Sequence, residues 1–198
     1  GPVRQLVAQV LSLAGIKPSV EARTGDDHEL YIARYLSGEA MYVGVLRDRE
    51  EGRSHVSLRF PERRHLYDTR AGRYLGETDR TEVLLDAGKC KLYALLPYRV
   101  SAVNVRPQAA SVQPGEEVQY LVSVDVSGAE RGMHAFRIEV TGPDGQRREY
   151  YGAQLVGKKG ATAGSFRLAR NDPAGTWTIT ATDIATGVTG QATVRVGE

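Results

Sequence analysis

The residues best suited to chemistry in this chain are its histidines, because imidazole is a common general base and metal ligand near neutral pH. They are His28, His55, His65 and His134. None lies in an HxH, HExxH or HxxxH pattern, so neighbouring residues supply no expected metal centre. Each lies in or beside an expected strand, where a surface or capping role is more frequent. We therefore predict no metal and no cofactor.

The sequence also lacks the usual nucleophile and phosphate motifs. It has no GxSxG elbow, no GxxxxGK[ST] loop and no cysteine–histidine pair in a supporting context. Glycosidic chemistry needs two carboxyl groups about 5–10 Å apart. The adjacent acidic pairs all fall in expected turns or strand starts, where acidic residues are common; they are Asp26-Asp27, Glu50-Glu51 and Glu116-Glu117. We predict no catalytic residue.

Tyrosine is the remaining residue type with a binding role, since an aromatic ring can stack on the face of a sugar. Of the ten tyrosines, Tyr150 and Tyr151 are the first candidates, because one of two neighbours in a strand faces outward or lies at an edge. We name both as candidate carbohydrate-stacking residues. The alternative is that they fill the edge of a sandwich, which is the more common use of tyrosine.

The composition is that of an ordinary globular protein. Of 198 residues, 41% are hydrophobic and 25% are charged, and the formal net charge is +2, without the basic stripe typical of nucleic-acid binding. The one basic cluster, residues 59–64 (RFPERR), is broken by Pro61 and Glu62, so we predict a solvated turn there. The single Cys90 cannot form an internal disulfide, and the alternation around it predicts an inward-facing side chain.

No apolar run approaches the ~20 residues that a bilayer-spanning helix needs, so membrane insertion is not expected. No signal peptide is recognisable. Gly1 and Pro2 resemble the pair that a protease leaves when it removes an expression tag. On that interpretation, the true N-terminus and any localisation signal lie outside this sequence.

Residues 3–14 (VRQLVAQVLSLA) have apolar side chains at helical spacing, which predicts a helix with a wide apolar face. Gly15 follows where a helix C-cap favours glycine, and Pro18 lies just beyond. One short helix cannot bury such a face alone. It must pack on the sandwich that follows or on a neighbouring domain.

From residue 19 onward, short alternating runs separated by turn residues predict strands. The first series is SVEAR, HELYIARYL, AMYVGVLRD, HVSLRF, HLYDT, TEVLLDA and KLYALLPYRV. Turn signals stand between them, at 24–27, 37–39, 50–53, 70–73 and 86–89. This spacing is typical of an antiparallel sandwich.

A second series of strands follows residues 104–114, which hold two prolines and are the best candidate for a linker. It comprises VQYLVSVDV, HAFRIEVTGPDG, REYYGAQLV, AGSFRLA, GTWTITATD and GQATVRV. In GTWTITATD, Trp177, Ile179 and Ala181 share one face, which predicts a core position for the tryptophan. We predict an all-β fold with two tandem antiparallel Ig-like β-sandwich domains, at 19–103 and 104–198, after an N-terminal helical segment at 1–18.

Part of the first series resembles a known family. Tyr67-Asp68, Arg70, Gly72 and Leu75-Gly76 are followed by LYALLPY at 92–98, and this pattern resembles the C-terminal β-sandwich of large β-galactosidase-like glycoside hydrolases. The helix at 3–14 is similar to the last helix of the trimerisation-type domain that precedes such a sandwich. VQPGEEV, EVTGPDG and NDPAGTWTITATDIATG look like an Ig-like or macroglobulin-type module of exported bacterial proteins.

The resemblance implies a non-catalytic accessory region that serves domain packing, oligomer support or spacing. The family's catalytic glutamates lie in its barrel, and no position here matches them. The implied partners are the preceding domains of the parent chain, with homo-oligomers formed through the parent and an extracellular or periplasmic location. Two alternatives stay open: a carbohydrate-binding module that uses exposed aromatic residues, and an adhesin-like module of the cell surface.

Overall fold

The computed structural model describes residues 2–15, 19–26, 29–128 and 130–197. Three residues with sequence-based expectations lie outside them: Pro18 after the helix, Asp27 in a turn, and His28 with its surface role. The chain divides into two compact units, one of residues 1–32, 45–63 and 78–90, the other of residues 33–44, 64–77 and 91–198.

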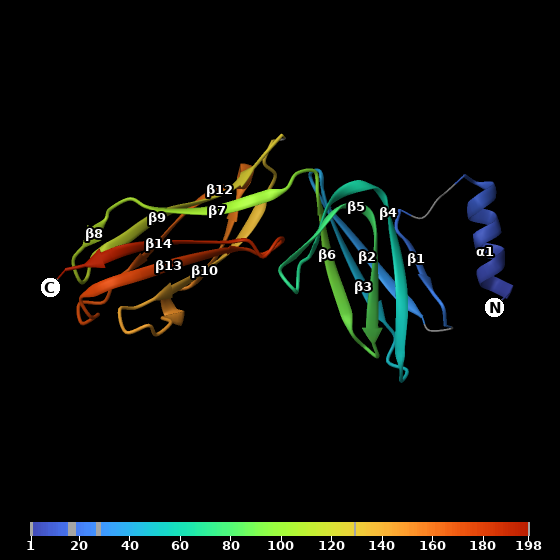
Figure 1. The fold of residues 1–198 in the computed structure, drawn as a ribbon, viewed down its shortest axis with the longest axis horizontal. Helices are drawn as coiled ribbons and strands as arrows, with labels where there is room; N and C mark the ends of the chain where they lie inside the picture. Colours follow the sequence, from blue (N-terminus) through green and yellow to red (C-terminus); the bar gives the residue numbers. More distant parts are fainter. Residues whose placement is uncertain (1, 16–18, 27–28, 129, 198) are drawn as a thin grey trace. The chain divides into compact units, whose positions relative to one another are not determined.

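The predicted all-β class, with antiparallel sheets and one short helix, is confirmed. Figure 1 shows α1 (Pro2–Leu13) near the N-terminus, and strands make up most of the described chain after it. Gly15 follows the helix with a left-handed φ of 68°, the conformation in which glycine is favoured at a helix end. No helix among the described residues is long and apolar enough to cross a membrane.

The first series of strands forms one six-stranded sheet. Its order is β1-β4-β6-β3-β2, with β5 paired to β4. The strands are β1 (Glu21–Thr24), β2 (Leu30–Ser37), β3 (Ala40–Arg47), β4 (Arg53–Asp68), β5 (Arg73–Asp86) and β6 (Cys90–Leu96). Alternation sets the core face: along β4, Val56, Leu58 and Phe60 are buried while the residues between them are exposed.

The solvated turn predicted at residues 59–64 is wrong, because β4 continues through this segment. Pro61, Glu62 and Arg63 are exposed, as expected for a solvated segment, but they are strand residues. β1 pairs with β4 as far as Arg59, and β6 pairs with it from His65 onward. The proline therefore falls between the two ladders, where its missing N–H removes no bond from either.

The second series forms two sheets, in the orders β11-β10-β13-β14-β8 and β12-β9-β7. Neighbouring strands are antiparallel, except that β14 pairs with β8 in parallel. The strands are β7 (Val100–Pro107), β8 (Ser111–Val112), β9 (Glu117–Val126), β10 (His134–Thr141), β11 (Ala153–Gly157), β12 (Ala161–Arg167), β13 (Gly175–Asp183) and β14 (Thr189–Val196). Two 3₁₀ turns, η1 (Glu149–Tyr151) and η2 (Lys158–Gly160), flank β11.

The core face of β13 is the predicted one. Trp177, Ile179 and Ala181 are buried, whereas the threonines between them are exposed or half-buried. The tryptophan N–H donates a hydrogen bond to the Pro173 carbonyl at 3.1 Å. A tight turn follows β10 at residues 142–145, and Gly145 takes a left-handed φ of 77° there.

The linker predicted at 104–114 is only partly correct. β7 continues to Pro107, and Val103 and Val105 are both buried on its core face. The alternation of the strand thus continues past residue 104, and β7 ends at Pro107, the first of the two prolines. The division into domains at residues 103 and 104 stays a prediction.

Candidate functional site

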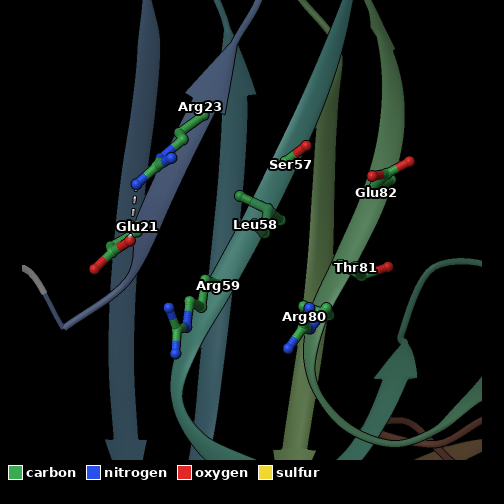
Figure 2. Close-up of a pocket in the computed structure, with 8 residues that line it drawn as sticks. All are labelled: Glu21, Arg23, Ser57, Leu58, Arg59, Arg80, Thr81 and Glu82. Atoms are coloured by element: carbon green, nitrogen blue, oxygen red, sulfur yellow. Dashed lines mark ion pairs between the residues drawn. The ribbon is translucent and has the colours of Figure 1, made fainter.

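A charged hollow of about 460 Å³ lies over β1, β4 and β5 (Figure 2). Its position follows in part from alternation, because Ser57 and Arg59 of β4 are exposed on the side opposite the core, with buried Leu58 between them. The register sets Glu21 opposite Arg59 and Arg23 opposite Ser57, and opposed residues share a face. The lining residues are Glu21, Arg23, Ser57, Leu58, Arg59, Arg80, Thr81 and Glu82.

Charges in this hollow pair with one another or with Asp79 beside it. The Arg23 guanidinium lies 3.8 Å from the Glu21 carboxylate. The Asp79 carboxylate lies 3.8 Å from Arg59 and 3.3 Å from Arg80. Burial alone would raise the pKa of Asp79, but the hydrogen bond from Arg80 and the nearby positive charges outweigh it and lower that pKa.

The hollow therefore offers charged and polar groups that could bind a polar ligand. Asp79 beside the hollow is ionised at neutral pH, as an ordinary carboxyl is, and its lowered pKa extends that charge to more acidic solution. Ser57 and Thr81 supply hydroxyls, and the arginines supply fixed donors. Within the described chain, no group of three or more His, Cys, Asp or Glu side chains could hold a metal ion.

His134 lies in an enclosed polar cluster, and its predicted surface or capping role is wrong. Its side chain is buried at the start of β10. Its Nδ1 lies 2.9 Å from the Asp183 carboxylate and its Nε2 lies 3.0 Å from the Tyr98 hydroxyl. The Gly132 N–H donates to the same hydroxyl at 2.7 Å, and Thr186 donates to Asp183.

This arrangement of tyrosine, histidine and aspartate is structural. The carboxylate only accepts, so the proton of the imidazole sits on Nδ1, and in the neutral ring Nε2 accepts from Tyr98. His134 and Asp183 have no exposed side-chain surface, and burial raises the pKa of Tyr98. No substrate can reach these groups, and their hydrogen bonds satisfy polar atoms that would otherwise be costly to bury.

Alternation was the signal that could have located this cluster. His134 shares a strand face with Phe136, Ile138 and Val140, all buried. Asp183 likewise shares a face with the buried residues of β13. The meeting of the two depends on the pairing of β10 with β13, in which Phe136 lies opposite Asp183.

Of the other histidines, His55 is exposed on β4. His65 is half-buried, and its Nδ1 lies 2.8 Å from the Tyr74 hydroxyl. Cys90 is half-buried at the start of β6. The acidic pair at 116–117 supports a turn, because Glu116 accepts a hydrogen bond from the Gln113 N–H at 2.8 Å. These contacts are structural.

Tyr150 and Tyr151 lie in the 3₁₀ turn η1, so the strand predicted for them is wrong. The turn places the two rings differently: Tyr150 is 70% exposed and Tyr151 is 9% exposed. Tyr151 stacks on Phe166, with ring centroids 5.0 Å apart. Its hydroxyl donates to Asp172 and accepts from the Ala169 N–H, and burial and the bond to Asp172 raise its pKa to about 12.

The residues that carry the family resemblance are structural in this fold. The hydroxyl of buried Tyr67 accepts a hydrogen bond from the Val100 N–H at 3.0 Å. Asp68 accepts one from the Ala71 N–H at 3.1 Å and pairs with Lys91 at 2.9 Å. Gly72 has a left-handed φ of 59° in the turn that follows. This motif therefore builds a turn and its support.

Comparisons with known proteins do not assign a family. No protein-family model and no curated protein sequence matches the chain. Among solved structures, the adhesin InvE of Yersinia pseudotuberculosis is similar at 14% identity and a TM-score of 0.37, over 90% of this chain and 49% of the adhesin. The chain thus spans about half of that protein's length.

Two further structures are similar at comparable levels. A DUF4785 family protein from Legionella pneumophila has 11% identity and a TM-score of 0.39, over 91% of this chain and 62% of its own. A β-glucosidase from Listeria innocua, solved with isofagomine, has 11% identity and a TM-score of 0.33, over 56% of this chain and 17% of its own. Similarities this low assign no function, and the all-β class is established by the strands themselves.

Proposed function

We propose that this chain is a non-catalytic β-sandwich module that packs against other domains of a larger, glycoside-hydrolase-like protein. Its role is to support and space those domains. The described residues hold a charged binding hollow and a sealed histidine cluster, and neither is built for bond cleavage. The glycosidase part of the proposal rests on the motif at residues 67–76 and the LYALLPY segment.

The observation that carries the packing role is the exposed apolar face of α1. Five apolar side chains of this helix are between 37% and 89% exposed: Leu6, Val7, Val10, Leu11 and Leu13. A helix of 12 residues is only marginally stable in water without tertiary packing. Its apolar stripe is therefore a surface that another domain would cover.

The test compares this chain with the longer protein encoded by the same reading frame. We expect the double change Leu6→Ser/Val10→Ser to lower Tm by several degrees in the longer protein, because it removes apolar contacts from a covered face. The same change should leave the Tm of residues 1–198 within about a degree. Gln9→Ser, on an exposed polar position of the helix, is the matched control in both proteins.

Two results would separate the parts of this proposal. If the double change has no effect in the longer protein, α1 does not pack on another domain and the packing role is wrong. If the effect appears but the longer protein hydrolyses no glycoside, the packing role stands and the glycosidase assignment is wrong.

A second candidate function is sugar binding, and the exposure of Tyr150 favours it. An aromatic ring that is 70% exposed offers a platform for a pyranose face. On this alternative, Tyr150→Ala abolishes glycan binding by the isolated chain, whereas Leu121→Ala, at an apolar residue of β9 that is 49% exposed, does not. A glycan array without binders, or binders that tolerate Tyr150→Ala, would exclude this site.

A further inference from the structure

The strand β2 ends the path of the six-stranded sheet, and its composition is unusual for such a position. β3 is its neighbour on one side in the order β1-β4-β6-β3-β2. The strand has eight residues, LYIARYLS, or about 27 Å at ~3.4 Å per residue. Exposed edges are normally short or charged, because their backbone groups can pair with another strand. β2 is long, and Arg34 is its only charged residue.

Apolar side chains are exposed on both faces of β2. Tyr31 and Tyr35 point to one face and are 56% and 69% exposed. Ile32 and Leu36 point to the other face and are 38% and 55% exposed. A solvated edge strand would keep polar side chains on at least one face, so this pattern indicates a surface that is covered.

The register of β2 on β3 follows from the turn between them. Gly38 and Glu39 form a two-residue turn, and the left-handed φ of 58° at Gly38 suits its first position. Ser37 then lies opposite Ala40, and counting back places Glu29 opposite Asp48. The hydrogen bond from the Asp48 N–H to the Glu29 carbonyl at 3.1 Å agrees with this register.

This register identifies which face of β2 continues the core. Ile32 lies opposite Val45, and Leu36 lies opposite Met41. Val45 is fully buried and Met41 is 7% exposed, so this is the core face of the sheet. The core face of the sheet therefore extends to β2, where its apolar side chains are exposed.

The same register identifies the free backbone groups. Glu29 and Ser37 bond toward β3, and the N–H and C=O groups of an antiparallel strand alternate between its two sides. Odd-numbered residues therefore bond to β3, while Leu30, Ile32, Arg34 and Leu36 direct their backbone groups outward. The outward groups form an unpaired ladder along the edge.

We propose that β2 pairs antiparallel with β2 of a second copy of this chain, around a two-fold axis at Ala33. Such an axis stands normal to the sheet, so each face continues across the junction. Tyr31 then lies opposite Tyr35 of the second copy, and Ala33 lies opposite its equivalent. On the core face, Leu30 lies opposite Leu36 of the second copy.

Self-complementarity favours a second copy over an unrelated strand. A register centred on Arg34 would place two like charges directly opposite, which is destabilising. The register centred on Ala33 instead places Arg34 opposite Ile32 of the second copy, where its aliphatic stem can pack. In this register the closely spaced, non-hydrogen-bonded pairs are Ala33 with its equivalent at the centre and Tyr31 with Tyr35 on either side. The inference goes beyond the proposed packing role, which depends on α1.

The first test is analytical ultracentrifugation of the whole chain from about 1 to 200 μM. We expect a reversible monomer–dimer equilibrium, and Leu36→Lys should weaken it at least tenfold by placing a charge on the joined core face. Leu121→Lys is the matched control, because Leu121 is 49% exposed on β9, and it should leave the equilibrium unchanged. Val10→Lys places a charge on the exposed apolar face of α1 and tests whether the chain associates through that helix instead.

The second test determines the register with a disulfide in a Cys90→Ser background. Ala33→Cys should give an oxidised dimer, since non-hydrogen-bonded pairs have Cα atoms about 4.5 Å apart, within the range for a disulfide. Arg34→Cys should cross-link at least tenfold less. A chain that stays monomeric throughout, or a dimer broken by Val10→Lys and not by Leu36→Lys, would overturn the proposal. Preferential cross-linking by Arg34→Cys would overturn its register.

Discussion

The two ends of the strand path β1-β4-β6-β3-β2 differ in length and in charge. β1 has four residues and carries Glu21 and Arg23, which line the charged hollow of Figure 2. β2 has eight residues and exposes apolar side chains on both faces. Short charged strands resist pairing with another chain, whereas long apolar ones invite it. The difference indicates that one end is made for solvent and the other for a partner strand.

This contrast extends to the arginines beside each end. Arg23 on β1 is an exposed residue in a loose ion pair of 3.8 Å. Arg47, at the end of β3, is fully buried and donates to Ser54 at 2.8 Å and to the Gly52 carbonyl at 2.7 Å. One charge solubilises the surface, and the other holds together the turn that precedes β4.

The largest expected effect is from Arg47→Ala. Loss of the Arg47 side chain would leave buried acceptors without donors and open a cavity. We therefore expect the free energy of unfolding to fall by about 3–5 kcal/mol. Arg23→Ala should change the free energy of unfolding by less than about 0.5 kcal/mol. Urea unfolding followed by circular dichroism measures both. Equal effects would mean that burial does not separate these two arginines.

Proline substitutions in β2 should separate its inner and outer backbone groups. Ala33→Pro removes an N–H that bonds to β3, and we expect a loss of about 3 kcal/mol. Arg34→Pro removes an outward N–H, so its cost in stability should be about 1 kcal/mol or less while self-association is lost. The opposite ranking in urea unfolding would show that the register of β2 is wrong.

A smaller effect concerns pH. Burial alone would raise the pKa of Asp68, but the hydrogen bonds from Lys91 and the Ala71 N–H outweigh it and lower that pKa below 3.8. A lowered folded pKa stabilises the fold above the ordinary value, and this stabilisation is lost as the pH falls through the folded pKa.

We therefore expect Asp68→Asn to destabilise at pH 7 and to make stability less dependent on pH below about 4. Asp79→Asn, beside the hollow, should change both quantities less, because solvent screens its exposed partners Arg59 and Arg80. Urea unfolding at a series of pH values measures this. Matching curves for Asp68→Asn and the unchanged protein would contradict the assigned role of the Lys91 pair.

The smallest expected effect is from making β1 apolar. Glu21→Val/Arg23→Val removes the charges of that end but leaves four residues of strand, so we expect no dimer through β1 and less than about 0.5 kcal/mol in stability. Ultracentrifugation in the Leu36→Lys background isolates this edge. Dimers of that triple variant would show that charge alone, without length, keeps β1 unpaired.

Local patterns predicted much of this fold. Alternation identified the buried face of β13, and helical spacing identified α1 and its apolar face. Pro61 was misleading, because a proline is tolerated in β4 where neither β1 nor β6 needs its N–H. Tyr150 and Tyr151 followed a strand-like pattern but occupy a tight turn, in which Tyr151 packs on Phe166 from another strand.

The features closest to function depended on strand order, which a sequence does not display. The charged hollow needs β1, β4 and β5 to be neighbours, and the His134 cluster needs β10 to pair with β13. β2 looked like any other alternating strand. Only its place at the end of the sheet makes its apolar residues a surface.

The most direct test of the account is amide hydrogen exchange along β2, resolved by residue with NMR at about 5 and 500 μM. We predict that Tyr31, Ala33 and Tyr35 are protected at both concentrations by their bonds to β3. Ile32, Arg34 and Leu36 should exchange rapidly at the lower concentration and gain at least tenfold protection at the higher one. Equal exchange of these three amides at both concentrations would contradict the pairing of β2 with a second copy.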